Sequence, residues 1–166
     1  MVNPLGRDLL GVIEAERRRG VRGIHSQRIS RRAELRRARG VAILAGARRR
    51  HLARLVRVAD PLIVPAGRQL ARQGDPARQF VLILEGSFEA TNGSGARVLR
   101  TGDHFGLDEL VAGAPSDETV TALTASEVLV LGRRETLGLM FAVPRLAGRM
   151  LEGCAARRRP WPAFVR

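Results

Sequence analysis

Short apolar runs separated by turn residues fill the middle of the chain and predict β-strands. Asn92-Gly93-Ser94-Gly95 is a hairpin signal between two of these runs. Successive side chains of a strand alternate between its faces, so Phe80, Leu82 and Leu84 are expected to point inward together. About seven or eight such strands predict an antiparallel sandwich or barrel. The predicted strands are Leu62–Val64, Gln69–Arg72, Phe80–Leu84, Ser87–Thr91, Arg97–Leu99, Val120–Leu123 and Glu127–Leu131.

Helical periodicity flanks this region on both sides. In Arg48–Ala59 the apolar positions Leu52, Leu55, Val56 and Ala59 recur at i, i+3, i+4 and i+7, which makes one stripe to bury. The Asp60-Pro61 pair ends this helix, because the residue before a proline avoids helical angles. The other predicted helices are Asp8–Arg19, Ser30–Arg39, Glu135–Ala142 and a last one that Pro144 opens.

Charge is unevenly distributed along a chain of globular composition. With 166 residues, 45% of them hydrophobic, the chain is long enough for one domain with a real core. All 29 basic residues are Arg, and residues 1–60 carry sixteen of them against five acids. Residues 61–150 carry nine against ten. A basic arm suits nucleic acid, an acidic membrane surface or an acidic protein, and a solvated Arg-rich helix surface explains it equally well.

Nothing in the sequence indicates export or a membrane. Cys154 is the only cysteine, so no internal disulfide forms, which fits a reducing compartment. The longest apolar run, Val41–Ala47, is far shorter than the roughly 20 residues of a membrane-spanning helix. The N-terminal residues include acids and lack the apolar segment of a signal peptide. We therefore expect a cytoplasmic protein without a transmembrane segment.

Several sequence blocks occur in the order and spacing of the cyclic nucleotide-binding domain family. They are Val64-Pro65-Ala66-Gly67, Gly74-Asp75-Pro76-Ala77, residues 80–86, Gly102-Asp103-His104-Phe105-Gly106, Gly113-Ala114-Pro115, residues 119–124 and Pro144-Arg145-Leu146-Ala147. From residue 43 to about 157 the chain resembles this family. The resemblance implies a mainly β fold with flanking helices, an antiparallel, jelly-roll-like β-roll as in the cAMP receptor protein. It also implies a regulatory domain whose ligand is cAMP or cGMP.

The resemblance makes residues 106–119 the counterpart of the family's phosphate-binding cassette, where backbone N–H groups cradle the cyclic phosphate. In the family, a glutamate after the Phe-Gly pair binds the ribose, and an arginine after the Gly-x-Pro turn binds the phosphate. Here those positions hold Leu107 and Ser116, and Asp117 and Glu118 follow. The missing arginine removes a charge-assisted bond worth about 1.5–3 kcal/mol. The added carboxylates repel a phosphate.

These departures favour a degenerate module without a cofactor. Such a module does not bind cAMP or cGMP in the family's manner and acts through protein contacts. The alternative is a cyclic-nucleotide or other small-ligand sensor of altered specificity. In that case a shifted loop presents Glu109 to the ribose, or the N–H groups around Gly106 and Ser116 hold the ligand. The candidate ligand-binding residues are Gly106, Leu107, Asp108, Glu109, Ser116, Asp117, Glu118 and Thr119.

Other chemistry has weaker support. Asp103, His104, Asp108 and Glu109 lie close in sequence, but a metal site without a second His or Cys is not favoured. The sequence holds no recognisable Ser–His–Asp or Cys–His motif and no P-loop. We therefore expect no enzymatic activity.

The Arg clusters are the predicted docking surface for a protein partner with an acidic surface. Non-specific binding of nucleic acid or acidic membrane is a weaker alternative. Stacking aromatics are few, and only six residues follow Pro160, where transcription factors of this superfamily carry a helix-turn-helix domain. We expect no sequence-specific DNA reading. The docking residues are Arg17, Arg18, Arg19, Arg31, Arg32, Arg36, Arg37, Arg48, Arg49 and Arg50.

These patterns divide the chain into three parts. Residues 1–40 form a basic helical arm, residues 41–160 the domain, and residues 161–166 a tail. Within the domain, the β-roll covers residues 62–132 and the closing helices cover 133–158. The apolar face of Leu146, Met150 and Cys154 on the last helix offers a homodimer contact.

Overall fold

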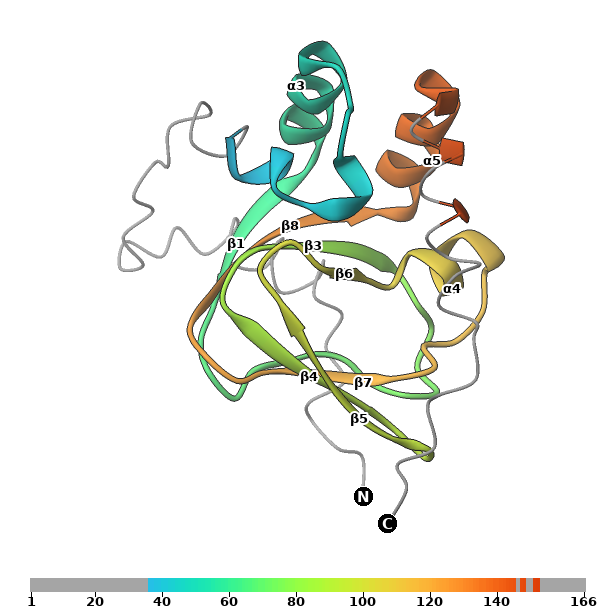
Figure 1. The fold of residues 1–166 in the computed structure, drawn as a ribbon. Coiled ribbons are helices and arrows are strands. Elements are labelled where there is room, and N and C mark those ends of the chain that lie inside the picture. Colours follow the sequence, from blue (N-terminus) through green and yellow to red (C-terminus); the bar gives the residue numbers. More distant parts are fainter. Residues whose placement is uncertain (1–35, 146, 149–150, 153–166) are drawn as a thin grey trace, which may run out of the picture. The chain divides into compact units, whose positions relative to one another are not determined.

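Two four-stranded antiparallel sheets form the centre of the domain (Figure 1). The computed structural model describes residues 36–145, 147–148 and 151–152. The strand order is β1-β8-β3-β6 in one sheet and β2-β7-β4-β5 in the other. The expected antiparallel β-roll is confirmed. Its strands are β1 (Asp60–Val64), β2 (Gln69–Ala71), β3 (Gln79–Glu85), β4 (Ser87–Asn92), β5 (Gly95–Arg100), β6 (His104–Phe105), β7 (Thr119–Ala122) and β8 (Ser126–Gly132).

One strand, β6, was not predicted. Its two residues follow the turn signal of Thr101-Gly102-Asp103 and are too few to show alternation. They become a strand because they pair with β3, with Val81 opposite Phe105. The predicted hairpin is present, since β4 and β5 pair directly up to Asn92 and Gly95.

Strand β3 is buried on both faces. Phe80, Leu82 and Leu84 belong to a cluster with helix residues, so they point toward the helices. Val81 alternates with them and points toward the other sheet. The two sheets meet there, because Phe105 lies 6.1 Å from Phe88 of β4 between ring centroids. The predicted alternation is real, but both sets of side chains are buried.

The helices cover one face of the β1-β8-β3-β6 sheet, the face on which Phe80, Leu82 and Leu84 of β3 lie (Figure 1). Leu52, Leu55 and Val56 of α3 are buried, as the apolar stripe predicted. The described residues after Pro144 are helical, which agrees with the predicted closing helix. The helical elements are η1 (Ala42–Leu44), α3 (Arg49–Val58), α4 (Leu107–Ala112) and α5 (Arg133–Ala142).

Residues 36–39 are helical and belong to the same core. Ala38 is fully buried in one cluster with Val41 and Leu44. The predicted helix Asp8–Arg19 lies outside the described residues, as does the beginning of Ser30–Arg39. In the part of the chain that the structure describes, no helix is both long enough and apolar enough to span a bilayer.

Candidate functional site

The cassette predicted at residues 106–119 is built around the short helix α4. Gly106 precedes it with φ of +79°, and a Cβ there would lie 2.3 Å from the carbonyl oxygen of Gln79. Only glycine fits this corner, because both the torsion and the contact exclude a side chain. At the other end, Gly113 adopts φ of +68°, and Arg133 Nη1 of α5 donates to the Leu110 carbonyl oxygen at 2.7 Å. The cassette helix is therefore tied to α5.

The second half of the cassette is fastened to the loop between β2 and β3. The N–H of Ser116 donates to Asp75 O at 2.8 Å, and the N–H of Gly74 donates to Ser116 O at 2.9 Å. Thr119 Oγ1 accepts a bond from the N–H of Gln73 at 3.0 Å. The Ser116 N–H was a candidate donor for a small ligand. In this structure the group is bonded to Asp75 within the chain, so a ligand would compete with that bond.

Leu107 occupies the position of the ribose-binding glutamate and points into the core. Its side chain is 1% exposed and lies in the cluster that joins α3, α5 and β3. The position therefore presents no polar group to a ligand. Asp108, the next residue, is partly exposed at the first turn of α4.

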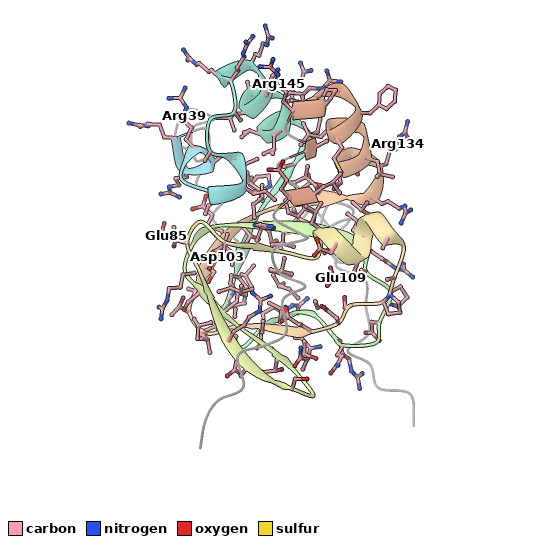
Figure 2. The ribbon with its side chains drawn as sticks, turned by 45° about the vertical axis from the view of Figure 1, so that its right-hand side comes forward. Arg39, Glu85, Asp103, Glu109, Arg134 and Arg145 are labelled. Carbon is pink, nitrogen blue, oxygen red and sulfur yellow. The ribbon has the colours of Figure 1, made fainter. Side chains whose placement is uncertain are left out.

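Glu109 and Asp117 meet across the cassette. Glu109 lies on the side of α4 that faces the sheets (Figure 2). Its carboxyl is hydrogen-bonded to that of Asp117, which follows the Gly-Ala-Pro-Ser turn. Burial raises the pKa of Glu109 to about 8, the hydrogen bond to Asp117 adds to this, and a bond from its own backbone N–H opposes it. Near neutral pH Glu109 thus keeps its proton, and its hydrogen bond to Asp117 joins the beginning of the cassette to its end.

Glu118 is paired with an arginine that the sequence analysis did not single out. Arg97 of β5 donates from Nε and Nη2 to the two carboxylate oxygens, at 2.9 and 2.6 Å. The hydrogen bond to Glu118 raises the pKa of Arg97 against the opposing effect of burial. The alternation of β5 carried the signal, because Arg97 lies two residues from the buried Leu99 and shares its face.

Asp103 and His104, which were considered as metal ligands, make contacts within the fold. His104 is buried and meets the ring of Phe80 edge-on, with centroids 5.7 Å apart. Asp103 accepts a bond from the N–H of Arg100 at 2.8 Å and closes a turn. Among the described residues, no three His, Cys, Asp or Glu side chains are grouped so that they could hold a metal ion.

The predicted docking arginines are only partly described. Arg36, Arg48, Arg49 and Arg50 are exposed. Arg37, in contrast, forms an ion pair with Glu127 of β8 through Nη1. Its Nη2 atom lies 3.6 Å from Oε2 of Glu85. It therefore has partners within the chain and is not a free docking group. Arg17, Arg18, Arg19, Arg31, Arg32 and the dimer candidates Leu146, Met150 and Cys154 lie outside the described residues.

Known proteins share this domain. Residues 61–142 match the family model of the cyclic nucleotide-binding domain. A cyclic nucleotide-gated potassium channel of Rhizobium etli is 31% identical over 107 residues, which are 64% of this chain and 30% of the channel. The chain thus spans less than a third of that relative.

Solved structures show the same fold. The catabolite activator protein of Thermus thermophilus has a TM-score of 0.64 at 23% identity, over 70% of this chain and 58% of that protein. The regulatory subunit of a cAMP-independent protein kinase A from Trypanosoma brucei has a TM-score of 0.66 at 18% identity, over 78% of this chain and 46% of the subunit. The family match, the relative and the β-roll agree. Residues 61–142 are a cyclic nucleotide-binding domain by family, as the sequence blocks indicated.

Proposed function

We propose that this domain is a non-enzymatic regulatory module that does not bind cAMP or cGMP in the family's manner and acts through protein contacts. The observation that carries this proposal is the carboxyl pair of Glu109 and Asp117 inside the cassette. By the family resemblance these positions border the cyclic phosphate, and two acidic groups supply no positive charge for it. Ser116 supplies no cation, and Leu107 faces the core. The fold is shared with a kinase regulatory subunit described as cAMP-independent, which makes such a module physically reasonable.

The outer surface of α5 supports the second half of the proposal. Phe141 is 91% exposed and Leu137 is 38% exposed, one helical turn apart on the same face. Arg134 and Arg145 lie before and after them and are also exposed (Figure 2). A large exposed aromatic side chain flanked by arginines is typical of protein contact surfaces. The positive charge suits a partner with an acidic surface.

Calorimetry with cAMP and cGMP tests the proposal directly. We expect the wild-type chain to show no binding tighter than about 1 mM, because position 116 holds no arginine and the described cassette presents acids there. A dissociation constant in the micromolar range for either nucleotide would contradict the proposal.

A gain-of-binding variant locates the cause. Glutamate at position 107 would bury a carboxylate in the core, so restoring the ribose contact there would destabilise the fold. Ser116→Arg with Asp117→Ala instead restores the cation and removes one acid. We expect it to bind cAMP at least about tenfold more tightly than the wild type. Thr101→Arg, which adds the same charge at an exposed turn, is the matched control and should gain nothing. If the double variant folds but does not bind cAMP, the backbone N–H groups of the cassette no longer suit the phosphate.

A further inference from the structure

Arg97 projects into the interior of the β-roll. In the register of β4 and β5, Phe88 lies opposite Leu99 and Ala90 lies opposite Arg97. Positions two apart share a face, so Arg97 and Ala90 point the same way as Phe88. Phe88 contacts Phe105 of the other sheet, so this is the inner face. The guanidinium therefore lies inside the roll, next to the end of the cassette.

The interior arginine is held by a carboxylate from its own chain. The two hydrogen bonds from Arg97 to Glu118 form the parallel, bidentate arrangement in which a guanidinium recognises a carboxylate. The side chains are 31% and 13% exposed, so the pair is largely removed from water. Such a pair contributes little to stability compared with well-packed apolar residues of the same volume. Stability alone therefore gives a weak reason for a charged pair at this position.

A second polar group faces the same end of the roll. Gln79 lies on β3 two residues from Val81, which points toward the interior, and its carbonyl oxygen contacts Gly106 at the beginning of the cassette. Its Nε2 atom is buried and has no hydrogen-bond partner among the described residues. Buried amides are normally satisfied, so an unused donor next to the beginning of the cassette indicates a place for an acceptor. The side chain of Ala90, which lies opposite Arg97 on the inner face, is small.

We propose that Arg97 is the anchor of a carboxylate-binding site inside the roll, and that Glu118 occupies this site as a built-in ligand until a small carboxylate displaces it. The observed partner of the guanidinium is a carboxylate, which fixes the preferred shape of the ligand head group. Asp117 and Asp103 lie close enough to act on Arg97 electrostatically. They weaken the attraction of the site for any anion, so a ligand that competes with Glu118 needs the two parallel hydrogen bonds that a carboxylate forms with a guanidinium. The site therefore differs in ligand class from the phosphate cradle that the family uses, and it goes beyond the proposed function.

Removal of the internal ligand tests the site. The Glu118→Ala chain is titrated with propionate, which carries a carboxylate like the deleted one, and binding is followed by the shift of the Arg97 Nε–H NMR signal and by thermal unfolding. We expect propionate to bind Glu118→Ala at least about tenfold more tightly than wild type, because the competing carboxylate is gone. Propionamide, of the same shape without the charge, should not bind. Glu89→Ala removes the same charge from the exposed outer face of β4 and should gain nothing.

Arg97→Met in the Glu118→Ala background should abolish the effect. The proposal is overturned if folded Glu118→Ala shows no preference for propionate over propionamide, or if the double variant binds propionate equally well. If Glu118→Ala does not fold, Glu118→Gln is titrated in its place with the same expected gain and the same overturning result. None of these outcomes depends on cyclic nucleotides, so failure here leaves the calorimetric test of the proposed function unaffected.

Discussion

Glu127 is buried and Glu109 is half-buried, and the chain compensates the two carboxyl groups in opposite ways. Glu127 of β8 receives a cation, Arg37, from the segment that precedes the roll. Glu109 of α4 receives a second acid, Asp117, from the other end of the cassette. A buried carboxylate stays charged only where an opposite charge compensates the lost hydration, and otherwise it retains its proton. The comparison teaches that burial and the partner together decide whether a glutamate serves as an ionic link or as a protonated hydrogen-bonding group.

The largest expected effect comes from breaking the ionic link. Arg37→Ala leaves the Glu127 carboxylate buried without its cation, which we expect to destabilise the domain by about 2–3 kcal/mol. The estimate is below the usual cost for a fully buried pair because the Arg37 side chain is partly exposed. Urea denaturation measures it. Arg39→Ala, at an exposed position two residues away, should change the free energy of unfolding by less than about 0.5 kcal/mol.

A companion variant distinguishes the lost pair from other consequences of the truncation. Glu127→Gln in the Arg37→Ala background removes the stranded charge, so it should recover most of the lost stability. Equal unfolding free energies for Arg37→Ala and Arg39→Ala would show that the ion pair is unimportant, and the contrast with Glu109 would disappear.

The pair of Glu109 and Asp117 is tested by pH. The folded pKa of Glu109, about 8, lies above the ordinary value of 4.5, so the folded chain holds this proton more tightly than the unfolded chain. The associated stability is fully present below about pH 4.5 and is lost as the pH rises through 8. Glu109→Gln mimics the protonated form and should lack this loss. Solvent screening reduces the effect, so we expect wild type to lose about 1–2 kcal/mol more than Glu109→Gln between pH 5 and pH 9.

Denaturation of both chains at pH 5, 7 and 9 provides the measurement. The comparison between them cancels the titration of groups that they share. Parallel pH profiles for wild type and Glu109→Gln would mean that Glu109 is ionised in the folded state.

The smallest effects separate the two neighbours of Glu109. Asp117 raises its pKa through both a hydrogen bond and a charge, whereas Asp108 acts through charge alone and most weakly. Both Asp117→Asn and Asp108→Asn should therefore lower the Glu109 pKa, and Asp117→Asn should lower it more. Carboxyl carbon NMR of Glu109 across a pH titration resolves the order. Equal shifts would argue against the carboxyl–carboxyl hydrogen bond.

Local patterns were sufficient for most of the fold and for the frame of the cassette. The alternation of strands, the stripe of α3 and the turn residues each act within a few positions, and the structure follows them. Gly106 and Gly113 could be placed because tight corners restrict the residue type. The resemblance to a known family supplied the order of the blocks, which local patterns do not contain.

The contacts that decide the chemistry were not accessible in this way. Arg37 and Glu127 are 90 positions apart, and Arg97 and Glu118 are 21 apart. No periodicity relates such pairs, since folding alone brings them together. The interior location of Arg97 could have been inferred from Leu99, but its partner could not. Departures at Leu107 and Ser116 were visible in the sequence, whereas the bond between Glu109 and Asp117 needed coordinates.

The helical residues before Gly40 also bear on where an independently expressed domain should begin. A chain shortened to start at Val41 would keep every strand of the roll. It would lose Ala38 from the core and Arg37 from Glu127, whose Oε1 atom already lacks a partner among the described residues. Such a fragment should aggregate or resist purification even though its sheets are complete. A start before residue 36 retains both contacts, so the unit that can be produced alone is longer than the β-roll that defines its family.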